Sequence, residues 1–121
     1  MTALVWLGAL VGGGVGATLR FLVDGAVGRH AGRAFPFGTL VVNLSGAIVL
    51  GLLSGLALPH DISLIVGTGV VGSYTTFSTW MLETQRLAEE RQNRYAAVNI
   101  IASVLLGLAA AALGRWLATM L

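Results

Sequence analysis

Apolar residues run in four long stretches along the chain, separated by short polar connections. The stretches without any Asp, Glu, Lys or Arg cover residues 1–19, 34–59, 62–82 and 95–114. Each is close to, or longer than, the ~20 residues with which a helix crosses the hydrocarbon core of a bilayer. The helices of a soluble bundle would instead carry a polar face along their length. The pattern therefore predicts an all-α membrane protein.

The same boundaries predict a single transmembrane domain over residues 1–121. Its four helices are expected near residues 3–24, 35–58, 62–84 and 95–118. Helices are the expected form because lipid offers no partners to free backbone N–H and C=O groups. The connections are short, so we expect a multi-pass protein of the cell membrane with little chain outside it.

Composition narrows the class of protein further. Hydrophobic residues make up 56% of the chain and charged residues 10%, and the net charge is +2. The basic residues are scattered and form no dense stripe, which argues against nucleic acid as a partner. The chain has no Cys, so disulfides and thiolate metal sites are excluded. It opens without basic residues, so we expect no cleaved signal peptide.

The seven basic residues are all Arg, and they are distributed unevenly over the connections. Six lie in the first and third connections, which share one side of the membrane, and Arg115 lies near the C-terminus. The six are Arg20, Arg29, Arg33, Arg86, Arg91 and Arg94. Cytoplasmic loops of membrane proteins are enriched in Arg and Lys. The bias therefore predicts that both termini face outward.

Glycines recur at four-residue spacing in the first two apolar stretches. They are Gly8, Gly12 and Gly16 in the first and Gly51 and Gly55 in the second. Small residues at this spacing let membrane helices approach closely, so we interpret most of them as packing positions. Four short helices enclose little space for a polar pathway. We therefore expect the protein to act as a dimer.

Polar residues inside the apolar stretches carry the functional signal. Thr39 and Asn43 are four residues apart and share a helix face, as do Asn99 and Ser103. A lone Ser or Thr usually bonds back to its own helix, so we give more weight to Asn43. Three glycines followed by hydroxyl residues, at 67–80, predict a helix broken near Gly72 to Thr76. Broken membrane helices free backbone groups that hold ions.

Three segments together resemble a known family. They read GGVGATLR at 13–20, GTLVVNLSG at 38–46 and GSYTTFST at 72–79, the last followed by Glu83. The chain resembles the Fluc family of fluoride channels, also called CrcB-like proteins, over all four spans. The resemblance implies passive export of fluoride from the cytoplasm by an antiparallel dimer with subunits of dual topology. It also implies a structural sodium ion (Na+) at the dimer centre, held by the backbone carbonyls of Gly72 and Thr75. Oxygen ligands suit such a hard cation.

The resemblance further implies which residues form the fluoride pathway. Arg20 would attract anions at a vestibule, Asn43 would donate its amide hydrogens to fluoride, and Phe77 would present the positive edge of its ring. Hydroxyl donors along the track would be Ser78, Thr79 and Ser103. Thr39 and Glu83 would lie near one entrance. Trp80 stands where the family usually has Phe, and Asn99 where some members have Tyr, so both positions depart from the pattern.

Other classes of protein remain as alternatives. An enzyme is not expected, since His30 and His60 fall in different connections and no metal-ligand cluster occurs. An accessory membrane subunit would explain the glycines but not Asn43 together with a broken span. A small four-helix multidrug-type transporter usually has an acidic residue within a span to couple protons. Here the acidic residues lie at span ends or in connections: Asp24, Asp61, Glu83, Glu89 and Glu90.

The identity of the partner subunit stays open at this point. An antiparallel dimer needs one subunit in each orientation, whereas the Arg bias favours a single orientation. The partner is therefore either a second copy of this chain or an oppositely oriented paralogue.

Overall fold

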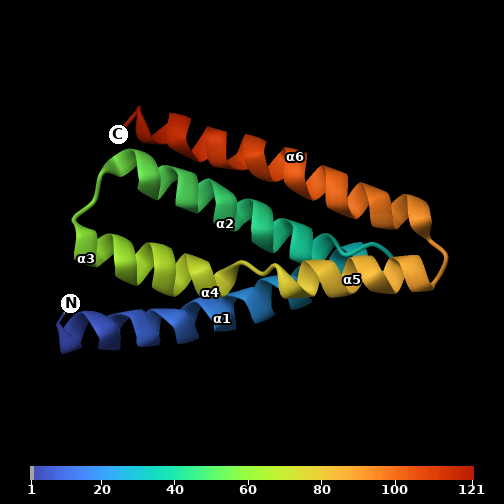
Figure 1. The fold of residues 1–121 in the computed structure, drawn as a ribbon, viewed down its shortest axis with the longest axis horizontal. Helices are drawn as coiled ribbons and strands as arrows, with labels where there is room; N and C mark the ends of the chain where they lie inside the picture. The colour runs from blue at the N-terminus through green and yellow to red at the C-terminus, as the bar shows by residue number, and fades with distance from the viewer. Residues whose placement is uncertain (1) are drawn as a thin grey trace.

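The computed structural model describes residues 2–121, and these residues form helices and no strand. The elements are α1 (Ala3–Ala31), α2 (Phe37–Leu56), α3 (His60–Ser63), the π-helix η1 (Leu64–Val71), α4 (Gly72–Tyr74), α5 (Ser78–Glu89) and α6 (Asn93–Ala118). Figure 1 shows them as roughly parallel rods, with both chain ends at the same end of the molecule.

Three of the helices are long and apolar enough to cross a membrane. These are α1 with 29 residues, α2 with 20 and α6 with 26. The prediction of an all-α membrane protein is thus confirmed. Helix α1 continues to Ala31, beyond the predicted end at residue 24, and it ends where Gly32 takes a positive φ of 79°. Charged residues limit the membrane-embedded part of a helix, but they do not end the helix itself.

The third predicted span contains no single long helix. It is assembled from α3, η1 and α4, followed by an interruption at residues 75–77 and then by α5. Thr75 is extended, with φ −77° and ψ 158°. The predicted interruption is therefore present, but it starts at Thr75 because Gly72–Tyr74 are still helical. A π-helical segment beside an interruption is a common feature of functional sites.

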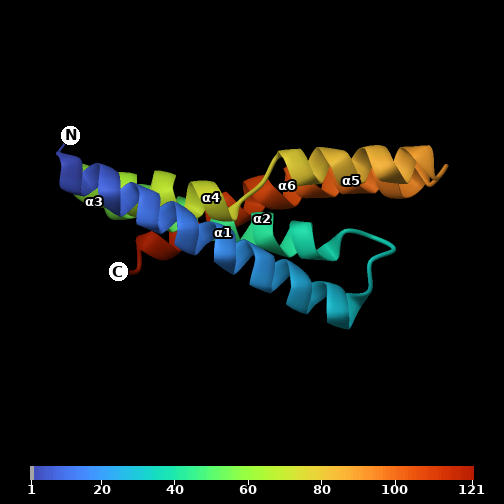
Figure 2. The ribbon, with the colours of Figure 1, turned by 90° about the horizontal axis from the view of Figure 1, so that it is seen from below.

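Close glycine contacts decide how the helices pair. A Cβ on Gly16 of α1 would collide with the carbonyl of Val70 in η1, and one on Gly12 would lie 3.1 Å from the carbonyl of Ile65. Helices α2 and α6 meet in the same way, because a Cβ on Gly51 would collide with the carbonyl of Ala111. The interpretation of these glycines as packing positions is confirmed. Figure 2 shows the C-terminal half of α1 diverging from α5.

Large apolar side chains cover most of the outer surface. Leu4, Leu10 and Leu108 are 77%, 72% and 67% exposed, whereas the fully buried large side chains are few. Extended apolar surface of this kind marks contact with lipid or with another subunit. The interior, by contrast, includes the polar residues Thr39 and Asn99.

Candidate functional site

The side chain of Asn43 holds the interruption of the third segment in place. Its Nδ2–H donates to the carbonyl of Thr76 at 2.9 Å, and its Oδ1 accepts the backbone N–H of Thr76 at 2.8 Å. The two bonds join the middle of α2 to a point where the chain is not helical. They satisfy backbone groups that would be costly to leave unpaired inside a membrane.

Thr76 also begins α5 by capping its first turn. Its Oγ1 accepts the backbone N–H of Thr79 at 3.2 Å and donates to Thr79 Oγ1 at 3.2 Å. The N-cap position of α5 is Phe77, so the Thr76 hydroxyl satisfies a first-turn amide from one residue earlier. Thr76 was not among the site residues predicted from the sequence. The sequence signal for such a role was the spacing of Thr76 and Thr79, two threonines three residues apart near the start of a helix.

Two carbonyls are released from helical hydrogen bonding by these contacts. In a continuous helix the N–H of Thr76 would bond the carbonyl of Gly72, and the N–H of Thr79 would bond that of Thr75. Here the first amide donates to Asn43 and the second to the Thr76 hydroxyl. Gly72 and Thr75 therefore offer carbonyl oxygens that these amides do not occupy.

A cavity of about 270 Å³ opens beside the interruption, between α2 and the start of α5. It is lined by Asn43, Gly46, Ala47, Leu50, Thr75, Thr76, Phe77 and Trp80. The rings of Phe77 and Trp80 meet edge to face, with centroids 5.7 Å apart and planes at 81°. Phe77 is 71% exposed in the single chain. The structure thus brings together three residues predicted for the fluoride pathway, Asn43, Phe77 and Trp80, and Thr75 of the predicted sodium site.

A second cavity, of about 190 Å³, lies between α1, α2 and the start of α5. It is lined by Ala17, Arg20, Phe21, Asp24, Thr39, Val42, Thr76 and Thr79. Arg20, Thr39 and Thr79 were all predicted as site residues, and the structure gathers them here. Thr76 lines both cavities, so the interruption separates them.

Glu83 marks the end of this region that adjoins the connection between α1 and α2. Its carboxylate accepts a hydrogen bond from the hydroxyl of the buried Thr39. A third cavity, of about 200 Å³, is lined by Glu83 together with Asp24, Arg33 and Arg86 and by several backbone segments. The resemblance implied that Thr39 and Glu83 both lie near one entrance. In the structure the two side chains are in direct contact.

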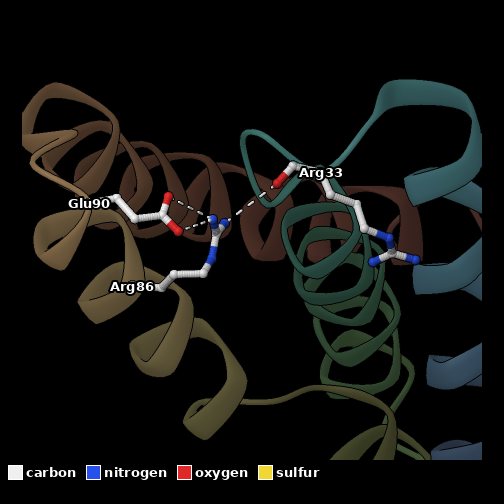
Figure 3. A network of polar contacts seen from close by, with 3 residues as sticks. All are labelled: Arg33, Arg86 and Glu90. Carbon is white, nitrogen blue, oxygen red and sulfur yellow. Dashed lines mark hydrogen bonds and ion pairs between the residues drawn. The ribbon is translucent and has the colours of Figure 1, made fainter.

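Arg86 ties the rim of this third cavity together. Figure 3 shows its guanidinium between Glu90 and Arg33. It lies 3.3 Å from the Glu90 carboxylate, and its Nη2 donates to the carbonyl of Arg33 at 3.5 Å. The pair with Glu90 is well exposed, so its contribution to stability is small. Arg33 and Arg86 both line the third cavity, so two arginines lie beside the acidic Glu83.

Four predicted site residues do not line the first two cavities, namely Gly72, Ser78, Glu83 and Ser103. Ser78 is exposed at the start of α5, and Ser103 is half-buried on α6. The aromatic Trp80 uses its indole N–H internally, donating to the carbonyl of Asn99 at 3.1 Å. Trp80 therefore presents its ring, and not its donor, to the cavity beside Asn43.

These features define an all-helical, multi-pass membrane protein whose polar side chains gather around an interrupted helix. Comparison with known proteins identifies the family to which it belongs. The family described as "CrcB-like protein, Camphor Resistance (CrcB)" matches residues 7–115. This chain belongs to the CrcB-like family, which confirms the resemblance found in the sequence.

Several curated relatives are similar over almost their whole length. A "Fluoride-specific ion channel FluC 2" of Mycolicibacterium paratuberculosis is 64% identical over 117 residues, covering 97% of this chain and 96% of the relative. A protein of the same name from Mycobacterium tuberculosis (strain ATCC 25618 / H37Rv) is 60% identical over 118 residues, covering 98% and 94%. "Fluoride-specific ion channel FluC 1" of Leifsonia xyli subsp. xyli is 45% identical over 121 residues, covering 97% and 88%.

Proposed function

We propose that this protein is a fluoride-specific ion channel that lets fluoride leave the cytoplasm passively. The names of the relatives support a channel and not an enzyme. The observation that carries the proposal in this chain is the cavity shared by Asn43, Phe77 and Trp80. It combines an amide donor with two aromatic rings and is free of acidic side chains, which would repel an anion.

The contacts of Asn43 suit an anion that accepts hydrogen bonds strongly. One amide hydrogen is held by the carbonyl of Thr76, and Oδ1 is held by the N–H of the same residue. The second amide hydrogen is then fixed in direction and remains available to fluoride. Phe77 adds the positive edge of its ring. Each contact is weak enough to let the ion move on, as conduction requires.

Arg20 lines the second cavity together with the acidic Asp24, and we assign to Arg20 the attraction of anions there. Its guanidinium stays charged at any working pH and raises the local anion concentration. Thr79 adds a hydroxyl to the lining of the same cavity, and Thr39 keeps the Glu83 carboxylate engaged through its own hydroxyl. Ser78 and Ser103 stay predictions as hydroxyl donors along the fluoride pathway. In this proposal they face surfaces that the second subunit completes.

Four crossings and an antiparallel dimer complete the proposal. Helices α3 to α5 together run from one end of the molecule to the other (Figure 1), as a fourth crossing must. Phe77 is 71% exposed in the single chain, although it lines the cavity of Asn43. A second subunit, either a copy of this chain or a paralogue, would close that side of the cavity.

A structural sodium ion fits the chemistry of the interruption. Sodium is a hard cation that prefers neutral oxygen ligands, and the carbonyls of Gly72 and Thr75 are left without their helical amide donors. When bound, the ion would offset the partial negative charge that these carbonyl oxygens carry. The residues that keep these carbonyls free are Asn43 and Thr76.

Reconstitution tests the proposal directly. Liposomes that contain the purified protein alone, loaded with equal fluoride and chloride, should release fluoride and retain chloride. Phe77→Ile should slow the release, because an aliphatic side chain has no positive edge, while the dimer still elutes normally from a sizing column. Chloride release as fast as fluoride release would contradict the assignment.

A further inference from the structure

Hydrogen bonds link Trp80, Thr84 and Asn99 into a closed ring between α5 and α6. The indole Nε1–H of Trp80 donates to the carbonyl of Asn99 at 3.1 Å, and the Asn99 amide donates to Thr84 Oγ1 at 2.9 Å. The hydroxyl of Thr84 then donates to the carbonyl of Trp80 at 2.8 Å. The ring begins and ends on Trp80, so it restrains both the backbone and the indole of one residue.

Packing alone does not account for this arrangement. Asn99 lies in an apolar helix and is 2% exposed, where an aliphatic side chain would need no partner. A threonine hydroxyl commonly bonds back to the carbonyl four residues earlier, as Thr84 does. The donation from Asn99 to the same hydroxyl adds a contact between helices. The polar atoms of the ring therefore act on Trp80 as a unit.

Restraint of Trp80 has a consequence for the cavity beside Asn43. The indole packs against Phe77 with ring centroids 5.7 Å apart, and both rings line that cavity. Phe77 is itself largely exposed in the single chain. The position of Trp80 thus determines one wall of the cavity and the surface on which the Phe77 ring packs. Thr84 and Asn99 are not among the residues that line this cavity.

We propose that Asn99 and Thr84 are positioning residues that set fluoride throughput by holding the Trp80 indole against Phe77. This inference rests on the proposed function as a fluoride channel. It assigns to α6 a role through Trp80 and not through direct contact with the ion. The indole N–H is consumed within the ring, so Trp80 serves the pathway as an aromatic wall.

Substitutions at Thr84 test the ring with little change in volume. Thr84→Val removes the hydroxyl and should lower fluoride release from liposomes by about fivefold, the factor that corresponds to one net hydrogen bond. Thr84→Ser keeps the hydroxyl and should restore release to the wild-type rate. Thr18→Val is the matched control, because the Thr18 hydroxyl also bonds the carbonyl four residues earlier, that of Gly14, at 2.8 Å.

A second background separates positioning from general stability. In Trp80→Phe the indole donor is absent and only the restraint of the backbone remains, so adding Thr84→Val or Asn99→Leu should lower release much less than in the wild-type background. If either substitution lowers release equally in both backgrounds, the residue acts on the fold in general and the inference is wrong. Release unchanged by Thr84→Val in the wild-type background would overturn it as well.

Fluorescence of Trp80 gives a readout that needs no fluoride. Trp6 and Trp116 are 59% and 54% exposed and lie far along the chain from Trp80, so both are replaced by Phe. Acrylamide should then quench Trp80 more strongly in Thr84→Val and Asn99→Leu than in Thr84→Ser. Quenching that is equal in all of these variants would overturn the inference even if the channel conducts. Absence of fluoride release from the wild type would contradict the proposed function separately.

Discussion

Asn43 and Thr76 are 33 residues apart in the chain, yet the side-chain amide of one pairs with the backbone of the other through two hydrogen bonds, of 2.9 and 2.8 Å. The amide of Asn43 takes the place of a neighbouring peptide unit. A residue outside any helix, Thr76, can therefore lie in the middle of a membrane segment without leaving its N–H and C=O unpaired. The same pairing orients the free amide hydrogen of Asn43.

Replacing Asn43 should therefore affect both stability and transport. Asn43→Leu leaves the N–H and C=O of Thr76 without partners, and we expect unfolding to become easier by about 2 kcal/mol. Fluoride release should fall as well, since the donor is lost. Thermal unfolding in detergent measures the first effect and liposome efflux the second. Ser54→Ala is the control on the same helix, because it removes only a bond to the carbonyl of Gly51. Equal stability of the two variants would contradict the pairing.

The contact between α2 and α6 should be intolerant of a single methyl group. A Cβ on Gly114 would collide with the carbonyl of Ile48, so Gly114→Ala should destabilise the protein by about 2 kcal/mol through overpacking. Gly107 on the same helix has nothing within 4 Å of such a Cβ. Gly107→Ala should be neutral or slightly stabilising. Detergent unfolding of both variants checks this, and the reverse order of stability would show that α6 packs on α2 differently.

Thr76 should control the proposed sodium site through the hydrogen bond that its hydroxyl accepts from the N–H of Thr79. In Thr76→Val the N–H of Thr79 loses the hydroxyl and turns to its helical acceptor, the carbonyl of Thr75. That carbonyl then competes less well for sodium, and the sodium concentration for half-maximal fluoride release should rise by about fivefold. Thr75→Ser should leave the sodium dependence unchanged, since only its backbone oxygen is involved. A sodium dependence that Thr76→Val does not alter would refute carbonyl coordination at this interruption.

The distribution of Arg residues makes a prediction about orientation in cells. With six Arg on one side and one on the other, this chain should insert mainly with both termini outside. Reporter enzymes fused to the C-terminus, one active only outside the cytoplasm and one only inside, measure the orientation. A strong bias would favour pairing with an oppositely oriented paralogue. Comparable signals from both reporters would instead support a homodimer of dual topology.

The pattern of residues was enough to predict the class of protein and an interrupted third segment, although the interruption starts at Thr75 because Gly72–Tyr74 are helical. Four charge-free stretches of about 20 residues suit a membrane, and the glycines at 67–72 followed by hydroxyl residues lower the helix propensity of the third stretch. The family motifs also pointed to Asn43 and Phe77, which line one cavity and whose part in fluoride transport stays a prediction. These properties are local, because each depends on the residues of one segment and on the surrounding lipid.

Which polar groups meet became clear from the packing of the helices. Nothing within α2 shows that Asn43 pairs with Thr76, and nothing within α6 shows that Asn99 restrains Trp80. The end of α1 at Ala31 was likewise missed, because charged residues limit insertion and not helix formation. Contacts between helices depend on their rotation and register, which the glycine contacts of Gly16 and Gly51 set in three dimensions. A hydrogen-bond partner supplied by another helix cannot be read from either segment alone.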